Sequence, residues 1–331
     1  MATLKDVARL ANVDVSTVSR ALNNTSYVHP DTKERIFAAV KELSYQPNVL
    51  SQGLRQGKRH TIGVVIPRLF LTIFADIAQI IEKEAASQGY ATLICHTEDD
   101  PLVEKQCLNR LRNGFVDGII IGATGKNRRL LRDIQSSGIP ILQIVRKQDL
   151  AMSSVIADYT ACGYDTVKYL FAKGCRNIGL INGSTDLATF RDRYSGYHKA
   201  MKEECLNETL ASSSHPCNSF EYGYDCTEQL LDLNPKLDAI IAAVDVQGMA
   251  ALRALKDHQI DVPNQVRVVS LTGHSVGDLL ETTMTSLEMP AVEMGQKAVE
   301  LIISEIERAS DEKFIPKHIV FPASLVERES S

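Results

Sequence analysis

The sequence lacks the features of a membrane protein or an exported protein. No run approaches the ~18 apolar residues of a membrane span, and no apolar export segment follows Met1. The seven cysteines are odd in number, irregular in spacing and include no C-x-x-C pair. This usage favours free thiols over a disulfide framework or a zinc site. We therefore expect a cytoplasmic protein.

The sequence also lacks the motifs that identify common enzymes. It contains no G-x-S-x-G, no P-loop and no H-E-x-x-H. Its eight histidines are scattered, and no Cys/His pair has the spacing of metal ligands. We therefore expect no catalytic activity, no metal and no cofactor. An aspartate at a strand end, such as Asp245, could act as a base, but ligand binding is sufficient to explain it.

What the sequence does contain is an uneven distribution of charge. The net charge of the 331 residues is −5, yet residues 1–60 hold nine Lys and Arg against five Asp and Glu, a balance of +4. The remaining residues hold 27 basic and 36 acidic side chains, a balance of −9. A basic head on an acidic body indicates a polyanionic partner for the head alone. At ~150 residues per domain, the length favours about two domains.

The basic segment follows the pattern of three short helices. The first is predicted to begin after Thr3, a suitable N-cap, and its apolar face would consist of Leu4, Val7, Ala8 and Ala11. Asp14 can cap a second helix, whose buried positions would be Val18, Ala21 and Leu22. A third helix would begin near Pro30 and bury Ile36, Ala39, Val40 and Leu43. Three short helices with a tight turn between the first two form a helix-turn-helix unit.

The outer face of the second helix consists of short side chains and one arginine. It carries Val15, Ser16, Thr17, Ser19 and Arg20. A helix that enters the DNA major groove, ~12 Å wide, needs short polar residues and a long basic one on that face. Hydroxyl and N-terminal N–H groups can hold phosphates, and Arg20 can reach a base edge. This pattern predicts DNA binding; a three-helix packing module with a solvated polar face is the alternative.

The stretch TLKDVARLANVDVSTVSRALNN, followed by TKERIFAAVKELSYQPN, resembles the DNA-binding head of the LacI/GalR (lactose-repressor) family. The resemblance implies that Val15 and Ser16 read bases. Two residues depart from the family pattern: Asp14 replaces the usual serine, and His29 stands where a capping serine is common. The residues of the head expected to contact DNA are Thr3, Val15, Ser16, Thr17, Ser19, Arg20 and Asn23.

A linker follows the head. In the family that the chain resembles, this linker forms a hinge helix that folds only on operator DNA and inserts a leucine into the minor groove. Leu54 matches that leucine. Asn48 can cap this helix, which would run through Arg55. Ser51 replaces the family's alanine, and Gly53 costs ~1 kcal/mol in a helix interior. We therefore expect a hinge that is ordered only with DNA and contacts it through Asn48, Ser51, Leu54 and Arg55; the alternative is a flexible basic linker without groove contacts.

From residue 61 onward, short apolar runs alternate with amphipathic helical stretches. This alternation predicts an α/β body with parallel sheets covered by helices. The predicted strands are TIGVVIP, ATLICH, VDGIIIG, IPILQIV, SVIAD, NIGLING, DAIIAAV, VRVVSL and HIVFPA. The family resemblance extends along the whole chain and implies a two-lobed body like that of periplasmic binding proteins.

The predicted organisation therefore has three parts. They are a helix-turn-helix head (1–46), a hinge (47–59) and an effector-binding and dimerisation body (60–331). The resemblance implies that the chain crosses between lobes near residues 160, 290 and 319. It assigns about 60–159 and 290–318 to the N-lobe, and about 160–289 and 319–331 to the C-lobe.

The candidate effector site lies at the strand ends that face the cleft between the lobes. Ligands of open α/β sheets bind beyond the carboxyl ends of the strands. Sugars need paired donors and acceptors and an aromatic face, which Arg193 with Asp245, and Phe74 or Phe190, can supply. By resemblance, FRDRYSGY matches the family's effector-binding arginine segment. The candidates are Arg68, Phe74, Arg146, Asp158, Phe190, Arg193, Asp245, Thr272 and His274.

The charge of the effector stays open at this point. SLTGH stands where the family usually has GYDD, so one acidic residue is lost. Arg68, Arg146 and His274 could balance an anion such as a sugar phosphate. A weaker resemblance to trehalose-operon repressors, through the arginine after the first strand, favours the same interpretation. The alternative is a neutral sugar, with Arg68 paired to a surface carboxylate.

The function that these features predict is transcriptional repression of carbohydrate-utilisation genes, controlled by a sugar or sugar phosphate. A homodimer would bind pseudo-palindromic operator DNA. The absence of a leucine heptad after residue 310 favours the dimer over a tetramer. Control mainly by a protein corepressor is the first alternative. A sugar-binding protein without a DNA role is the second, and the first 60 residues argue against it.

Overall fold

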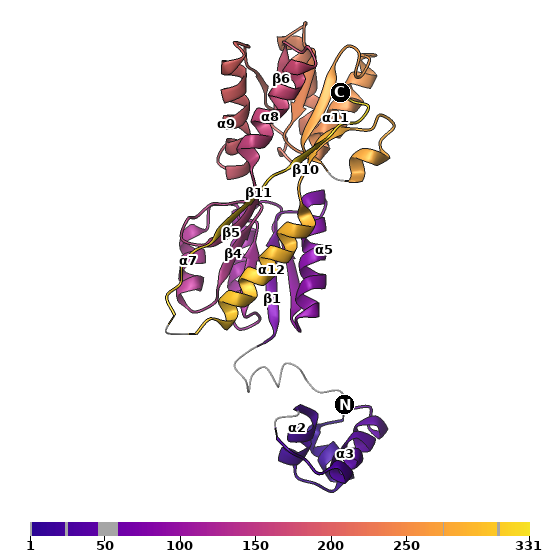
Figure 1. Ribbon diagram of the computed structural model, residues 1–331, viewed down its shortest axis with the longest axis vertical. Helices are drawn as coiled ribbons and strands as arrows, with labels where there is room; N and C mark the ends of the chain where they lie inside the picture. Colours follow the sequence, from indigo (N-terminus) through magenta and orange to yellow (C-terminus); the bar gives the residue numbers. More distant parts are fainter. Residues whose placement is uncertain (1, 24–25, 46–58, 274, 310–311) are drawn as a thin grey trace. The chain divides into compact units, whose positions relative to one another are not determined.

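The computed structural model describes residues 2–23, 26–45, 59–273, 275–309 and 312–331 (Figure 1). The chain divides between Arg59 and His60 into two compact units, the head and the body, and each is described by itself. The hinge residues Asn48, Ser51, Leu54 and Arg55 lie outside the described residues, as does His274.

The described part of the head contains the three predicted helices, α1 (Leu4–Ala11), α2 (Val15–Asn23) and α3 (Pro30–Glu42). Thr3 is the N-cap of α1: its backbone N–H donates to the Asp6 carboxylate at 2.9 Å, and its Oγ1 accepts from the Asp6 N–H at 3.4 Å. The helices enclose a small core made of Val7, Ala8, Ala11, Val18, Ala21, Ile36 and Ala39. This core confirms the predicted apolar faces.

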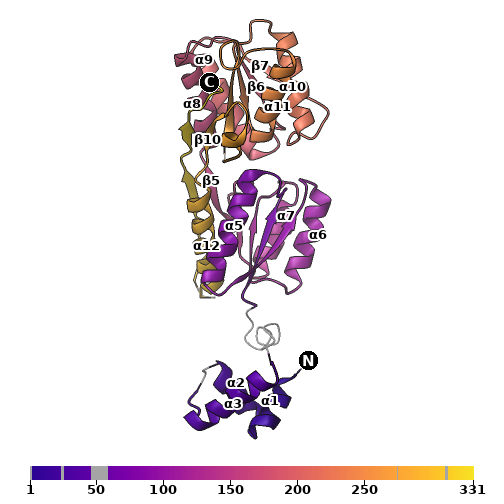
Figure 2. The ribbon, with the colours of Figure 1, turned by 90° about the vertical axis from the view of Figure 1, so that its right-hand side faces the viewer.

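The N-lobe is built on a parallel sheet with the strand order β11-β5-β4-β3-β1-β2. Its strands are β1 (Thr61–Ile66), β2 (Ala91–His96), β3 (Gly118–Ile121), β4 (Ile141–Ile144), β5 (Ser153–Ala157) and β11 (His318–Phe321). Its helices are α5 (Thr72–Ser87), α6 (Pro101–Arg112), α7 (Arg128–Ser136) and α12 (Ala291–Glu307). The views show α5 and α12 on one face of the sheet and α6 and α7 on the other (Figures 1 and 2). Because both faces are covered, the central strands β3 and β4 are buried along their whole length and are apolar except for Gln143.

The C-lobe repeats this plan with the strand order β12-β10-β9-β8-β6-β7. Its strands are β6 (Ile178–Ile181), β7 (Thr209–Ala211), β8 (Ala239–Ala242), β9 (Arg267–Gly273), β10 (Thr285–Glu288) and β12 (Ser324–Val326). Its helices are α8 (Tyr159–Ala172), α9 (Ala188–Glu203), α10 (Phe220–Leu233), α11 (Asp245–Asp257) and the short 3-10 helix η1 (Ser275–Leu279). The pairs α8 with α9 and α10 with α11 pack together. The two-lobed α/β body is therefore as the sequence predicts.

The structure differs from the predicted body in two respects. The strands β7, β10 and β12 were not predicted, because their short sequences TLA, TSLE and SLV contain no apolar run of the kind that marks the other strands. Of these, β12 pairs antiparallel to β10, so the second sheet is not purely parallel. The third crossing between lobes also comes later than expected. His318–Phe321 pairs with β5 in the N-lobe sheet, so the chain crosses between Phe321 and Ser324 and not near 319.

All seven cysteines are free thiols, which confirms the prediction from their spacing. Among the described residues, no helix combines the length and the apolar character that a membrane span requires. The same residues hold no cluster of three or more His, Cys, Asp or Glu side chains arranged to bind a metal ion.

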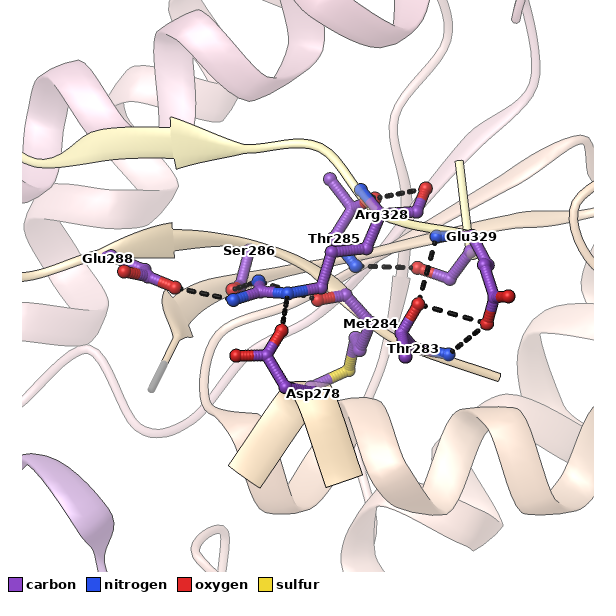
Figure 3. A network of polar contacts seen from close by, with 9 residues as sticks. Asp278, Thr283, Met284, Thr285, Ser286, Glu288, Arg328 and Glu329 are labelled. Carbon is purple, nitrogen blue, oxygen red and sulfur yellow. Dashed lines mark hydrogen bonds and ion pairs between the residues drawn. The ribbon is translucent and has the colours of Figure 1, made fainter. Parts of the chain in front are cut away.

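An arginine near the C-terminus joins several segments of the C-lobe (Figure 3). The Arg328 side chain is only 9% exposed and forms ion pairs with Asp278 of η1 and with Glu288, the last residue of β10, the latter at 2.6 Å. It also donates to the Met284 carbonyl at 3.1 Å and to Ser286 Oγ at 2.9 Å. The second crossing between lobes, Glu288 to Ala291, is thereby anchored to the η1 segment and to β12.

We expect Arg328→Ala to lower the free energy of unfolding by about 2 kcal/mol. Charge-assisted hydrogen bonds contribute ~1.5–3 kcal/mol each, but partial exposure of both carboxylates reduces the loss. Urea unfolding followed by circular dichroism measures the change. Lys199→Ala is the control, because Lys199 pairs with Glu203 at 4.0 Å on the surface and should contribute little. Equal stability of the two variants would contradict the anchoring role of Arg328.

Candidate functional site

The outer face of α2 presents the predicted DNA-reading residues to solvent. Ser16 and Arg20 are exposed and lie four residues apart, on one side of the helix. The Arg20 guanidinium forms no hydrogen bond or ion pair with the described residues. Val15, Thr17 and Ser19 are half-buried beside them, while Val18 and Ala21 face the core. The face therefore offers one long cation among short side chains, which is the shape that a groove-reading helix needs.

The backbone N–H groups at the start of α2 could bind an anion, but the negative charge of Asp14 would oppose this. The Asp14 carbonyl accepts from the Thr17 and Val18 N–H groups, and α2 begins with these hydrogen bonds. The Asp14 side chain is exposed, so its negative charge lies at the helix end. Thr3 is also exposed. The side chain of Asn23 lies outside the described residues, so its predicted DNA contact stays a prediction.

The second candidate site is a small cavity between the two lobes of the body. Its volume is about 30 Å³, room for one or two water molecules and far too little for a sugar. Six of the nine predicted effector residues line it: Phe74, Arg146, Phe190, Arg193, Asp245 and Thr272. The strand-end rule therefore brings most of its candidates to one place.

Arg193 is the most unusual residue of this cavity, because it is a buried cation that no carboxylate contacts among the described residues. Its Nη2 donates to Thr272 Oγ1 at 2.7 Å, and its guanidinium carbon lies 4.6 Å from the centroid of the Tyr159 ring. Its Nε is buried and has no hydrogen-bond partner in this part of the structure. Burial lowers the pKa of the guanidinium, but an arginine stays protonated in proteins. This N–H is therefore an unsatisfied buried donor within the described residues.

The position of Arg193 depends on an unusually close approach of α8 and α9. A Cβ atom at Gly163 would lie 2.1 Å from the Arg193 carbonyl oxygen, and one at Gly196 would lie 2.0 Å from the Thr160 carbonyl oxygen. Only glycine fits at both points. The contact brings the first residue of α8, Tyr159, over the guanidinium of Arg193.

Arg146, on the N-lobe side of the cavity, is also buried but is neutralised. It follows β4, and Val145 before it has a left-handed φ of 65°, a rare conformation for a β-branched residue. Both terminal nitrogens of Arg146 donate to the Asp99 carboxylate, one of them at 3.1 Å. The guanidinium carbon lies 5.4 Å from the centroid of the Phe74 ring. Arg146 thus reaches the cavity as a member of an ion pair.

Direct polar contacts join the two lobes across the cleft. Thr72 Oγ1 of α5 donates to the Asp245 carboxylate of α11 at 2.8 Å. Asn218 Nδ2 of the C-lobe donates to the Asp99 carboxylate of the N-lobe at 3.1 Å. At the surface, an ion pair of 2.8 Å connects Lys126 and Asp186. These contacts join the two walls of the cavity, so the described body is closed.

Two predicted effector residues do not line the cavity. Arg68 follows β1 and is half-buried outside it. Asp158 is the N-cap of α8, accepts from the Ala161 N–H at 2.9 Å and lies beside the first and third crossings. His274 lies outside the described residues. The sequence analysis did not identify several residues that line the cavity or contact its lining: Leu71, Thr72, Ile73, Asp99, Val145, Thr189, Asn218 and Val244.

Two family descriptions together match most of the chain. Residues 3–48 match bacterial regulatory proteins, lacI family. Residues 59–326 match periplasmic binding proteins and sugar binding domain of LacI family. The first match covers the head and the second covers nearly the whole body.

Individual relatives match over the full length. The HTH-type transcriptional regulator RegA of Clostridium saccharobutylicum is 31% identical over 337 residues, and the alignment covers 100% of both chains. The solved lac repressor bound to ONPG in its repressed state is 25% identical with a TM-score of 0.86, over 100% of this chain and 99% of that one. The solved complex of the transcriptional regulator CelR with cellobiose is 26% identical with a TM-score of 0.74, over 100% of both chains.

We expect Arg20→Ala to abolish the preference for a specific duplex over bulk competitor DNA. A base-reading arginine contributes ~1–3 kcal/mol of discrimination, which corresponds to about tenfold to hundredfold in affinity. Fluorescence anisotropy measures this with a duplex selected by the wild-type protein from random DNA. Arg35→Ala removes the same charge from the exposed surface of α3 and should keep the preference. The role of Arg20 is wrong if the two variants discriminate equally well.

Proposed function

The chain belongs to the lacI family of bacterial regulatory proteins and is a DNA-binding transcriptional repressor with a body of the sugar-binding type. From this premise we propose that it represses carbohydrate-utilisation genes under the control of a neutral sugar that binds between its lobes. Residues of the α2 outer face, above all Ser16 and Arg20, would contact the operator.

One observation carries the proposed effector site: the buried Nε of Arg193 has no partner among the described residues. A buried donor without an acceptor costs ~1–3 kcal/mol, and a sugar hydroxyl would remove that cost. Phe74 and Phe190 line the same cavity and offer apolar surface to the C–H face of a sugar ring. Asp245 would exchange the Thr72 hydroxyl for a hydroxyl of the ligand.

The charges around the cavity favour a neutral ligand over a phosphorylated one. Each lobe provides one arginine and one aspartate: Arg146 with Asp99 in the N-lobe, and Arg193 with Asp245 in the C-lobe. The described charges therefore balance, and the cleft has no excess cation that requires an anion. The anionic alternative depended on Arg68, Arg146 and His274. Arg68 lies outside the cavity lining, Arg146 is already paired, and His274 lies outside the described residues.

Ligand control would act through the separation and closure of the lobes. A sugar that contacts Phe74 on one lobe and Arg193 on the other holds a particular closure, and closure determines where the start of the body, His60, lies relative to the partner subunit. A ligand can shift this equilibrium only by its difference in affinity for the two states; a ratio of ~10⁴ reverses a 1:99 population.

We also propose that the repressor acts as a homodimer. Two heads on one dimer would bind the two halves of a pseudo-palindromic operator. In the N-lobe, the edge strand β2 leaves Leu93 and Ile94 exposed by 37% and 40%. Exposed apolar residues on a sheet edge favour association with a further chain.

Sedimentation equilibrium should accordingly give the mass of two 36.5 kDa chains at micromolar concentration. Burial of the apolar edge is the physical reason for this expectation. Added operator duplex should bind one dimer per site, because each head occupies one half-site. A mass of one chain, with or without operator, would exclude the dimer.

We expect Arg193→Met to weaken sugar binding about tenfold to hundredfold, because the ligand loses a charge-assisted hydrogen bond of ~1.5–3 kcal/mol. A thermal-shift screen of neutral sugars first identifies the ligand, and isothermal titration calorimetry then measures its affinity. Removal of a buried charge should not lower the thermal midpoint, and operator binding without sugar should be unchanged.

Arg191→Met is the matched control for this prediction. Arg191 lies on the same helix but is exposed, and its ion pair with Asp192 is 3.6 Å long. This variant should bind the sugar as the wild type does. If no neutral sugar binds the wild type, while a protein partner is required for operator binding, control by a corepressor protein replaces this proposal.

A further inference from the structure

The carboxylate of Asp99 contacts residues of both lobes at the edge of the cavity. Asp99 is not among the residues predicted from the sequence. Its carboxylate accepts from Arg146 of the N-lobe and, at 3.1 Å, from Asn218 of the C-lobe. Arg146 and Asn218 are buried, and both line the cavity. We propose that Asp99 determines which ligand charge the cleft accepts: by neutralising Arg146, it restricts the cleft to uncharged molecules. This inference rests on the proposed role of the cleft as the effector site.

The chain holds the Asp99 carboxylate in place through its backbone. Glu98 and Asp99 both adopt the left-handed conformation, at φ 54° and 61°, which is rare for residues other than glycine. The turn is fixed on both sides: the Glu98 N–H donates to the Pro67 carbonyl at 2.6 Å, and the Asp100 N–H donates to the Thr97 carbonyl at 2.9 Å. Asp100 then caps α6 with its own side chain. Such a backbone is retained where the surrounding structure over-determines it.

The neutralisation of Arg146 does not depend on closure of the cleft. Asp99 follows β2 and Arg146 follows β4, and both strands belong to the N-lobe sheet. The ion pair therefore stays intact when the lobes separate and a ligand enters. Only the contact from Asn218 is lost at that stage, because Asn218 belongs to the other lobe. An incoming ligand thus meets a pair of zero net charge on the N-lobe.

Removal of the Asp99 charge would change this electrostatic balance. Arg146 and Arg193 would then face the cleft with Asp245 as the one carboxylate that lines the described cavity. An opposite charge close to a buried cation is strongly favourable at low dielectric. The variant cleft should therefore prefer an anion, and the arginine fork of Arg146 is suited to bind two phosphate oxygens.

The decisive experiment compares Asp99→Asn with the wild type, using inorganic phosphate as the anionic probe in isothermal titration calorimetry. We expect the variant to bind phosphate at least about tenfold more tightly, because a charge at contact distance contributes at least that factor. Asn has the size of Asp and can still accept from Asn218, so mainly the charge changes. The double variant Asp99→Asn/Arg146→Gln should lose the gain.

Glu98→Gln is the matched control. Glu98 is the neighbouring residue, exposed and in the same turn, and its removal changes the net charge of the chain equally. Phosphate affinity of this variant should equal that of the wild type. If Asp99→Asn and Glu98→Gln bind phosphate equally, or if the double variant keeps the gain, Asp99 has no role in ligand charge.

A second variant keeps the test valid if Asp99→Asn does not fold. Asp99→Ser removes the same charge with a smaller side chain that admits water, and it should gain phosphate affinity in the same way if Asp99→Asn is not obtained as a folded protein. Operator binding by each variant without ligand reports an intact head and dimer. Absence of sugar binding by the wild type would overturn the proposed function alone, because the phosphate measurement tests Asp99 independently of any sugar.

Discussion

The body depends on one costly arrangement: a guanidinium kept out of water without a carboxylate in contact with it. The Arg193 side chain is buried between aromatic rings, and Thr272 is the single side chain to which it donates within the described residues. Two glycines, Gly163 and Gly196, permit the helix contact that places it there. An unsatisfied buried donor of this kind needs an explanation, and the proposed sugar would supply the missing acceptor. In that proposal, the aromatic neighbours, the hydroxyl of Thr272 and the carboxylate of Asp245 would surround the bound sugar.

The cleft between the lobes is closed, and the charges that surround it balance. Each lobe brings its own arginine and its own aspartate, so neither lobe repels the other when they meet. The polar groups of the two walls satisfy each other through Thr72 with Asp245 and Asn218 with Asp99. The proposed ligand would therefore exchange these contacts for its own.

Much of the fold can be predicted from the sequence because its signals are local. The apolar faces of the head helices and the apolar runs of the buried strands appear directly as periodicity. The strands β7, β10 and β12 cannot be found in this way, because their three or four residues mix polar with apolar side chains and form no apolar run. The strand-end rule finds Arg193 and Asp245, but it cannot show that Asp99 reaches Arg146, since that contact joins the ends of two strands separated by β1 and β3. Asn218 lies on a loop between β7 and α10 without any pattern that could reveal it.

The positions of the lining residues along the chain have a consequence for how ligand specificity can evolve in such regulators. Phe74, Arg146, Phe190, Asp245 and Thr272 come from different segments, each at the end of its own strand or in the helix that follows it. None of them lies at the three connections between the lobes, Ala157 to Tyr159, Glu288 to Ala291 and Phe321 to Ser324. If the lining binds the effector as proposed, single replacements in it would let a duplicated gene acquire recognition of a new metabolite. The descendant would keep the connections between the lobes and the DNA-binding head, so the same set of genes would respond to a different metabolite.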